Sequence, residues 1–481
     1  MDQPVGEMQS VPVAVELRGV LRYSLTYMTG SVAYKAVALL AIPILARLLT
    51  PAELGLLDLA ALIASIISLV AGIGLDTAIA RFQPAEKAGR LWATAAVTLA
   101  AAALISALLG LALAETVSMA IVGSGSRASL IAAAVVYGVA LAAIGFALTF
   151  VRLTDRPGAY SRYAFLIVMA QMVTAIGIAA FMSQPLPAVV WGWTGASVIG
   201  LIVLFWRQRM PLGGVDRELA ARLVRFGGPL VPAAVVWIVG DLGIRAVIAN
   251  AGTLAALGSY GIAARIVSLL GLFVAAFGLA WYPHVFTLSR DAVASTSQRA
   301  LIQIVGGMGT AAILISTVAP EAVLLIAGPD YAEATQAVPG MAGSMVVLGV
   351  MTIVSAVVAM ERGTTPVAIA SGLGAVLQVA LTFVLVPRLG LAGAAIGVGL
   401  GYGGAAIALL QRAHFLRLGG WHAATISMSA SILIAALTLT QLLSTSPLLH
   451  RGVAGLLAAG LFVASCRLAW ARSPDRGRGP D

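Results

Sequence analysis

The stretch SLIAAAVVYGVALAAIGFALTFV, residues 129–151, contains no Asp, Glu, Lys or Arg. A helix needs about 20 mostly apolar residues to cross a hydrocarbon core roughly 30 Å thick. Runs of this kind recur along the chain, separated by polar or Pro/Gly breaks. With residues 129–151 they make fourteen, the others lying at about 20–46, 55–80, 91–113, 160–182, 188–206, 229–250, 256–283, 300–320, 337–360, 365–386, 391–411, 423–443 and 452–470. Strands of a β-barrel alternate in polarity over about 10 residues, which these runs do not. The sequence therefore predicts an all-α polytopic integral membrane protein with about 14 transmembrane helices.

The composition excludes several classes of protein. Of 481 residues, 60% are hydrophobic and 10% are charged, against about 25% charged in a soluble domain. A soluble enzyme, a disordered chain and a nucleic-acid-binding domain are all excluded. One cysteine, Cys466, allows no intramolecular disulfide. The four histidines show no metal-ligand spacing and stand at His284, His414, His422 and His450. We expect no cofactor, no metal and no cleaved signal peptide in residues 1–17.

The distribution of Lys and Arg predicts the orientation. If the N-terminus is cytoplasmic, 22 of the 29 cations fall in cytoplasmic segments and four fall on the other side, at Arg47, Arg127, Arg388 and Arg451. One missed span would invert every later loop, so the split supports the whole assignment. It also accounts for the net charge of +10 without nucleic acid. We expect a multi-pass protein of the inner (cytoplasmic) membrane with both termini in the cytoplasm.

The longest polar stretch, residues 207–228, divides the chain. We expect a cytoplasmic tail at 1–19, a first lobe of six spans at 20–206, a linker at 207–228, a second lobe of six spans at 229–412, two further spans at 413–470 and a tail at 471–481. Within the linker, DRELAARLVRF (216–226) predicts either a short amphipathic helix on the cytoplasmic face or a solvated connection.

The two halves resemble each other weakly. Gly55 and Gly258 stand at matching points of two spans, and GLDTAIARF (74–82) aligns with GLAWYPHVF (278–286) at nearly the same offset. Six-span halves start on the same side of the membrane, so the relation is a parallel repeat about an axis along the membrane normal. The repeat favours a transporter over a receptor or a membrane-embedded enzyme.

Two segments, SVAYKAVALLAIPILARLLTPAELGLLDLAALI (31–63) and GLDTAIARF (74–82), resemble the opening of the polysaccharide-biosynthesis flippases. These are the Wzx-like members of the multidrug/oligosaccharidyl-lipid/polysaccharide (MOP) exporter superfamily. The residues that match the family pattern are Pro43, Arg47, Leu49, Thr50, Pro51, Glu53, Gly55, Gly74, Leu75, Arg81 and Phe82. AGPDYAEA (327–334) and residues 363–404 match as well, although Gln378 stands where the family often has Asn.

The resemblance covers nearly all of residues 20–412. It implies two six-helix lobes of the MATE/MOP type, a V-shaped central cavity and alternating access. It also implies a substrate, an undecaprenyl-diphosphate-linked oligosaccharide that is moved from the cytoplasmic to the periplasmic leaflet. The expected partners are this lipid-linked substrate, membrane lipids and other membrane proteins of glycan assembly.

The segment LTPAELG (49–55) also has a local interpretation. Thr50 can cap the following helix, Pro51 suits the first helical position, and Glu53 completes a capping box. The motif would then fix a tight turn between the first two spans, which is a structural role rather than substrate binding.

Ionisable residues inside spans are costly and usually face a cavity or a partner. Lys35, Asp241 and Arg265 are expected near mid-membrane, with Arg245 one helical turn further out. The substrate-binding candidates are Lys35, Arg245, Arg265 and Asp241, and the coupling-ion candidates are Asp76 and Asp241. Their three cations and one anion would suit a diphosphate, since cations in a wet cavity lower the barrier to its crossing.

Simpler interpretations stand beside these. Asp241 and Arg245 are spaced i,i+4 and can neutralise each other. Asp58, near the predicted periplasmic surface, is expected to be solvated. Lys35 and Arg265 have no partner within their own helices, which favours a role in the cavity.

The predicted function is export of lipid-linked oligosaccharide for capsule, exopolysaccharide or O-antigen synthesis. One alternative is a proton- or Na⁺-coupled multidrug exporter of the MATE type, which would carry carboxylates deep in one lobe. The other is a membrane enzyme or polymerase of glycan assembly, which would need a large periplasmic loop. The predicted loops are short, and no phosphate loop, triad or paired carboxylates are present, so we expect no enzyme activity.

Overall fold

The computed structural model describes the part of the chain that carries most of the predicted spans. The described residues are 41, 43–83, 86–154, 157–182, 185–209, 213–228, 230–287, 290–413, 434–435, 437–438, 442 and 446–471. Lys35 and nearly all of the spans predicted at 20–46 and 423–443 lie outside the described residues.

The described residues are helical, without a strand, and form two compact units. Unit 1 takes its described residues from Met1–Ile44, Ile67–Leu108 and Val136–Gly228, and unit 2 takes its own from Leu45–Ile66, Leu109–Val135 and Pro229–Asp481. The helices that lie wholly or mainly in unit 1 are α3 (Leu75–Phe82), α4 (Ala88–Ala112), α6 (Ala128–Leu153), α7 (Pro157–Phe181), α8 (Leu186–Gln208) and α9 (Arg217–Gly227).

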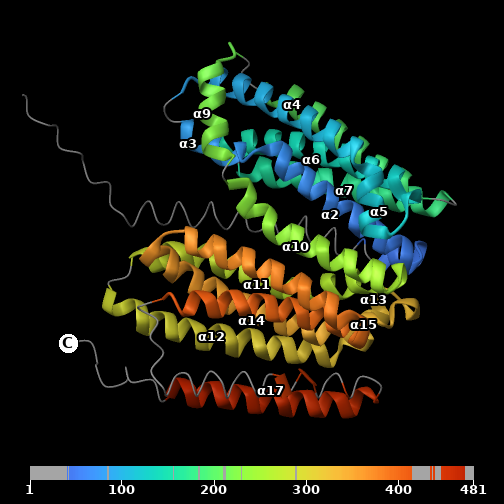
Figure 1. The fold of residues 1–481 in the computed structure, drawn as a ribbon, viewed down its shortest axis with the longest axis vertical. Helices are drawn as coiled ribbons and strands as arrows, with labels where there is room; N and C mark the ends of the chain where they lie inside the picture. The colour runs from blue at the N-terminus through green and yellow to red at the C-terminus, as the bar shows by residue number, and fades with distance from the viewer. Residues whose placement is uncertain are drawn as a thin grey trace, which may run out of the picture. The chain divides into compact units, whose positions relative to one another are not determined.

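Unit 2 contains the greater part of α2, the short elements α5 and η1, and every described helix from α10 onward. Its elements are α2 (Pro51–Gly72), α5 (Ala114–Val122), η1 (Gly125–Arg127), α10 (Leu230–Ala251), α11 (Leu254–Thr287), α12 (Arg290–Thr317), α13 (Ala319–Ile326), η2 (Pro329–Tyr331), α14 (Ala334–Arg362), α15 (Thr365–Leu410) and α17 (Leu448–Ala471). Helices α11, α12, α14 and α15 run side by side (Figure 1).

Twelve of the fourteen predicted spans fall on described helices, and ten helices among the described residues are long and apolar enough to cross a membrane. One boundary differs from the prediction. The span predicted at 55–80 is two helices, α2 and α3, and Ile73 and Gly74 between them take positive φ angles of 45° and 63°. The spans at 365–386 and 391–411 both lie in the long element α15, which is broken between them at Gly390, as predicted. The short helices α5 and α13 were not predicted.

The order of elements repeats along the chain. Helices α4, α5, η1 and α6 are followed later in the sequence by the matching series α12, α13, η2 and α14. The start of α5 at Ala114 corresponds to the start of α13 at Ala319. Likewise, the start of η1 at Gly125 corresponds to the start of η2 at Pro329. The offset between these starts is nearly the one that separates Gly55 from Gly258, so the weak sequence repeat corresponds to a repeat of structure.

Aromatic and aliphatic side chains fill the core of unit 1. The ring of Trp92 on α4 contacts Phe146 and Phe150 of α6 edge to face, with centroids 5.5 and 4.8 Å apart. Leu219 and Leu223 of α9 are fully buried in the same cluster. Aromatic contacts join α4 to α6, and the two buried leucines add α9 to the same core.

The linker helix α9 confirms the amphipathic helix predicted at 216–226. Asp216 caps it by accepting hydrogen bonds from the backbone N–H groups of Glu218 and Leu219, at 2.8 and 3.2 Å. Its apolar side lies against α3, where Gly227 and Gly74 touch backbone to backbone. The helix therefore buries its apolar face in unit 1 rather than in lipid.

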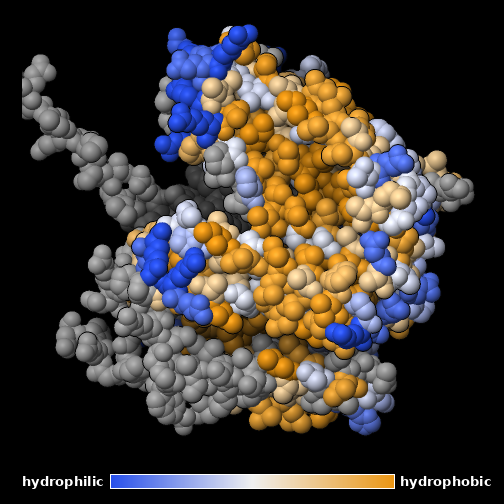
Figure 2. Space-filling model, in the orientation of Figure 1, coloured by the Kyte–Doolittle hydropathy of each residue, from blue (hydrophilic) through white to orange (hydrophobic). Residues whose placement is uncertain are grey.

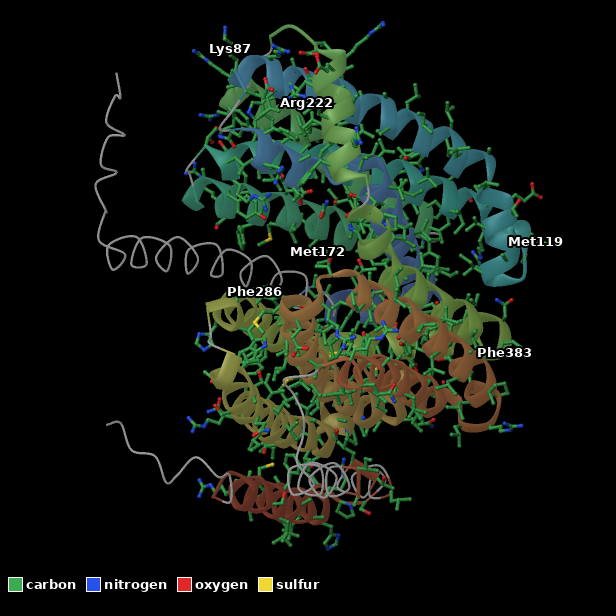
Figure 3. All side chains as sticks on the ribbon, turned by 60° about the vertical axis from the view of Figure 1, so that its left-hand side comes forward. Lys87, Met119, Met172, Arg222, Phe286 and Phe383 are labelled. Atoms are coloured by element: carbon green, nitrogen blue, oxygen red, sulfur yellow. The ribbon has the colours of Figure 1, made fainter. Side chains whose placement is uncertain are left out.

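The surface of each unit is that of a membrane protein. In Figure 2, hydrophobic side chains cover the sides of the helices, and hydrophilic ones gather at helix ends, over α9 among others. Large apolar side chains such as Leu104, Leu108 and Phe383 are 60%, 60% and 67% exposed. Such exposure suits contact with lipid tails. Lys87 and Arg222 lie at the same end of unit 1 (Figure 3), as the positive-inside pattern predicts for a cytoplasmic end.

The orientation is testable with reporter fusions. Three long helices, α10, α11 and α12, and the short helix α13 lie between Arg217 and Pro329. The two positions are on opposite sides if each of the three long helices crosses the membrane and α13, with 8 residues, does not. We expect a reporter fused after Arg217 to be active in the cytoplasm and one fused after Pro329 in the periplasm. Activity of both on one side would contradict the span assignment.

Candidate functional site

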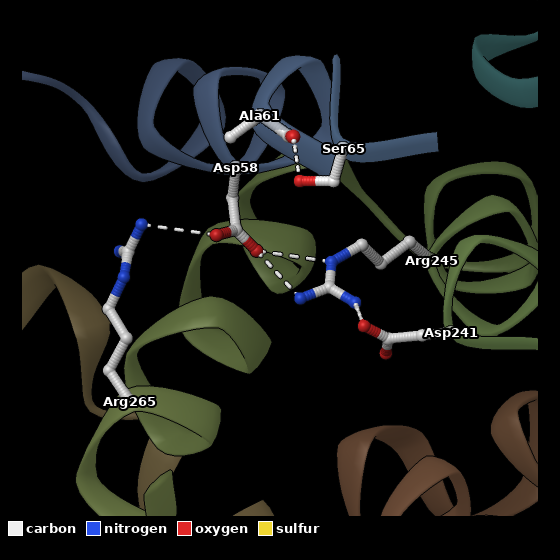
Figure 4. A network of polar contacts seen from close by, with 6 residues as sticks. All are labelled: Asp58, Ala61, Ser65, Asp241, Arg245 and Arg265. Carbon is white, nitrogen blue, oxygen red and sulfur yellow. Dashed lines mark hydrogen bonds and ion pairs between the residues drawn. The ribbon is translucent and has the colours of Figure 1, made fainter. Parts of the chain in front are cut away.

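Four charged side chains meet inside unit 2, contributed by α2, α10 and α11 (Figure 4). Arg245 of α10 donates from Nε and Nη2 to Oδ2 of Asp58 on α2, at 3.1 and 2.9 Å. Arg265 of α11 donates from Nη2 to the other oxygen, Oδ1, at 3.1 Å. Arg245 also forms an ion pair through Nη1 with Asp241, one turn before it on α10. We call Asp58, Asp241, Arg245 and Arg265 the ion-pair cluster.

Burial increases from Asp241 toward Arg245. The side chains of Asp241, Arg265, Asp58 and Arg245 are 41%, 27%, 16% and 9% exposed. Arg245 also lies 5.6 Å from the centroid of the buried Tyr260 ring. A charge held in low dielectric needs an opposite charge beside it. With two acids and two arginines, the cluster carries no net charge, and Asp241 is its most accessible member.

The start of α2 is fixed by the predicted capping box. The backbone N–H of Thr50 donates to Glu53 Oε2 at 2.9 Å, and the N–H of Glu53 donates back to Thr50 Oγ1 at 3.3 Å. Tyr331 donates its hydroxyl to the carbonyl of Leu49 at 3.1 Å. Burial raises the pKa of Tyr331, so this hydroxyl stays protonated and remains a donor.

Glycines bring α2 against α11. A Cβ on Gly258 would lie 1.9 Å from the carbonyl oxygen of Pro51, and one on Gly55 would lie 2.6 Å from the nitrogen of Gly258. The two helices therefore touch backbone to backbone. One turn further along α11, Gly261 leaves room for the carboxylate of Asp58, which a Cβ would approach to 3.3 Å. The glycines that matched in the sequence repeat are thus partners in space.

The cluster lies well inside its helices. Asp58 is seven residues from the start of α2, Arg265 eleven from the start of α11, and Arg245 six from the end of α10. At 1.5 Å per residue these positions are about 9–17 Å from those helix ends. That depth places the cluster in the apolar part of a membrane, where an ionisable group marks a functional site by default.

The structure confirms one of the two interpretations of the Asp241–Arg245 spacing, because the pair is formed. It corrects the prediction for Asp58, which is not solvated but bridges both arginines. Arg265 has no partner in its own helix, as predicted, but finds one in α2. Asp76 lies on α3 in unit 1 and is exposed, whereas the four residues of the cluster belong to unit 2.

One nitrogen of the cluster has neither a hydrogen bond nor an ion pair within the described residues. Nη1 of Arg265 is buried and makes no hydrogen bond within the described residues. Groups of His, Cys, Asp and Glu that could hold a metal ion are absent from the same residues. Arg245 and Arg265 remain candidates for binding an anionic ligand. Lys35, the remaining sequence candidate for the same role, lies outside the described residues.

Solved structures with the same arrangement of helices are transporters and flippases. A lipid II flippase MurJ in an inward closed conformation matches with a TM-score of 0.69 and 11% identity, over 93% of this chain and 100% of that one. An inward-facing MATE family multidrug resistance transporter of the MOP superfamily matches with a TM-score of 0.59 and 18% identity, over 83% and 96%. An Asp-to-Asn mutant of the Vibrio cholerae MATE transporter VcmN matches with a TM-score of 0.57 and 14% identity, over 83% of this chain and 98% of that one.

The chain is thus a multi-pass membrane protein with the fold of the MOP superfamily of transporters, and neither its family nor these structures point to an enzyme. A family model described as "Polysaccharide biosynthesis protein" matches residues 44–336. The chain belongs to this polysaccharide biosynthesis family, which confirms the resemblance seen in the sequence. No curated protein sequence matches it significantly.

The contact between α2 and α11 gives a prediction. Gly258→Ala places a methyl group against the backbone of Pro51, so we expect about 1–3 kcal/mol of destabilisation from overpacking. Thermal unfolding of the purified protein in detergent, followed by tryptophan fluorescence, measures it. Gly145→Ala is the matched control, because no atom lies within 4 Å of a Cβ there. Equal melting temperatures for the two variants would contradict the close approach.

Proposed function

We propose that this protein moves a lipid-linked oligosaccharide with a diphosphate head group from the cytoplasmic to the periplasmic leaflet of the inner membrane. The observation that carries the proposal is the convergence of Arg245 and Arg265 on one point inside the apolar helices of a polysaccharide biosynthesis family member. The lipid II flippase MurJ, which shares the fold, supports a lipid-linked substrate by analogy.

The chemistry of the two arginines suits a diphosphate. A guanidinium presents a planar fork of donors that matches phosphate oxygens in pairs, and it stays charged under all conditions. Arg245 and Arg265 come from different helices and aim Nη2 at the two oxygens of a single carboxylate. Two neighbouring phosphoryl oxygens would meet the same donors. The arginines would hold the charged head while the lipid tail stays in the bilayer.

The orientation, partners and pathway belong to the same proposal. The distribution of Lys and Arg supports cytoplasmic termini. The substrate would be an undecaprenyl-diphosphate-linked repeat unit for capsule, exopolysaccharide or O-antigen, handed on to other membrane proteins of glycan assembly. The division into a lobe at 20–206, a linker at 207–228 and a lobe at 229–412 would allow the alternating movement that such transport requires.

A second function is favoured by the charge of the cluster. The sequence predicted three cations with one anion, but the described cluster holds two acids and two arginines. Asp241, 41% exposed and on α10, has the chemistry of a proton or Na⁺ coupling site. A cation-coupled exporter of the MATE type would use such a carboxylate. The family match favours the flippase over this alternative.

Deletion of the gene separates the two functions. We expect undecaprenyl-linked repeat units to accumulate on the cytoplasmic face, because their route outward is lost. Lipid extraction and mass spectrometry measure the pool, and accessibility to an external lectin reports the leaflet. Unchanged lipid-linked pools together with new sensitivity to cationic drugs would support the exporter and contradict the flippase.

Arg265 should be required for transport. The loss of one charged hydrogen bond to a phosphate removes about 1.5–3 kcal/mol of binding, roughly tenfold to a hundredfold in affinity. We therefore expect Arg265→Ala to lower glycan export at least about tenfold at normal abundance, and Arg265→Lys to retain part of it. Arg388→Ala, at an exposed position of α15, is the control.

Immunoblotting of the membrane fraction separates binding from stability. Normal export by Arg265→Ala would contradict the role proposed for this arginine. Loss of the variant from the membrane would show that Arg265 acts only as the structural partner of Asp58.

A further inference from the structure

We propose that Asp58 is an internal substitute for the substrate's phosphate, and that binding of a diphosphate displaces it and releases α2 from α10 and α11. This inference rests on the function proposed above and adds a coupling between binding and movement. It gives the carboxylate on α2 the role of a competitor for the arginines, rather than of a ligand for the substrate.

The first support is the geometry of the carboxylate. Oδ2 of Asp58 receives two donors of Arg245, and Oδ1 receives one donor of Arg265. This is how a phosphoryl group is bound between two guanidinium groups. The carboxylate therefore occupies the place that the ligand's anionic oxygens would take.

The second support is the incomplete satisfaction of the arginines. Nη1 of Arg265 is buried without an acceptor among the described residues. A carboxylate has two oxygens to share between two guanidinium groups, whereas a diphosphate has more acceptor oxygens and more charge. A buried donor without a partner is costly, so a diphosphate that also reaches this nitrogen gains free energy that Asp58 cannot supply.

The third support is that the position of Asp58 depends on the position of α2. Its side chain is short, with two rotatable bonds, and it reaches both arginines because α2 lies close to α11, where Gly55 and Gly258 touch and Gly261 leaves room for the carboxylate. The two ion pairs therefore help to hold α2 against α10 and α11, and a ligand that takes the arginines removes that contribution. Since a ligand moves a conformational equilibrium only through its different affinity for two states, this competition supplies that difference.

The hydrogen bonds that hold the start of α2 can break and form again when α2 moves. Besides the two ion pairs, Tyr331 donates to Leu49 and Arg47 donates to the carbonyl of Leu325 at 3.1 Å. Each is a single hydrogen bond near the end of the helix. The bond of Tyr331 is buried, whereas that of Arg47 is exposed, where water can replace the partner. When the diphosphate leaves, Arg265 has no anion beside it and Arg245 has only Asp241, so Asp58 returns to them.

Binding of undecaprenyl diphosphate to the purified protein in nanodiscs tests the competition. Asp58→Asn keeps the shape of the side chain and removes its charge, so we expect this variant to bind the probe about tenfold more tightly than the unaltered protein. Asp330→Asn, at an exposed site in η2, should bind as the unaltered protein does. Equal or weaker binding by Asp58→Asn would show that Asp58 positions the arginines, and would overturn the inference.

Hydrogen exchange on the unaltered protein tests the release of α2 without any variant. We expect residues 51–62 to exchange faster when undecaprenyl diphosphate is bound. Slower or unchanged exchange with the probe bound would overturn the release. If neither the unaltered protein nor Asp58→Asn binds the probe, the proposed function itself fails, which distinguishes that result from failure of the inference alone.

Discussion

The packing of α2, α10 and α11 in unit 2 depends on the two ion pairs that Asp58 forms, one with Arg245 and one with Arg265. The helices that carry these groups are otherwise apolar, so each charge would be costly to bury alone. Together the two acids and two arginines are neutral, and each arginine is held by a carboxylate from another helix or another turn. The glycine contact of α2 with α11 and the capped start of α2 serve to bring Asp58 to that point.

The repeat of one series of helices accounts for the glycine that α2 and α11 each carry at their contact. The series α4, α5, η1 and α6 recurs as α12, α13, η2 and α14 later in the chain, at a nearly constant offset. Gly55 and Gly258 are equivalent in this repeat and lie against each other. Equivalent positions that meet across an axis of symmetry need complementary surfaces, and two glycines provide the simplest pair. The charges are not equivalent, which makes the site asymmetric.

Hydropathy, spacing and local motifs predicted most of the fold. Twelve apolar runs became helices, and the capping box at Thr50 and the i,i+4 pair of Asp241 and Arg245 formed as expected. The apolar runs gave the break at Gly390 but not the one at Gly74, since glycine inside an apolar run also occurs in unbroken helices. The partner of Arg265 was missed because depth alone placed Asp58 near the surface. Which way a helix face turns depends on its neighbours, and a single sequence does not contain that information.

The central claim is that Asp58 and Arg265 act as one unit, and a double-mutant cycle tests it most directly. Asp58→Asn, Arg265→Gln and the double variant are compared with the unaltered protein by thermal unfolding in the same detergent. Each single change leaves a buried charge without its partner, so the sum of their costs should exceed the cost of the double change. The account predicts a coupling free energy of about 1 kcal/mol or more. Additive effects, within about 0.5 kcal/mol, would contradict it.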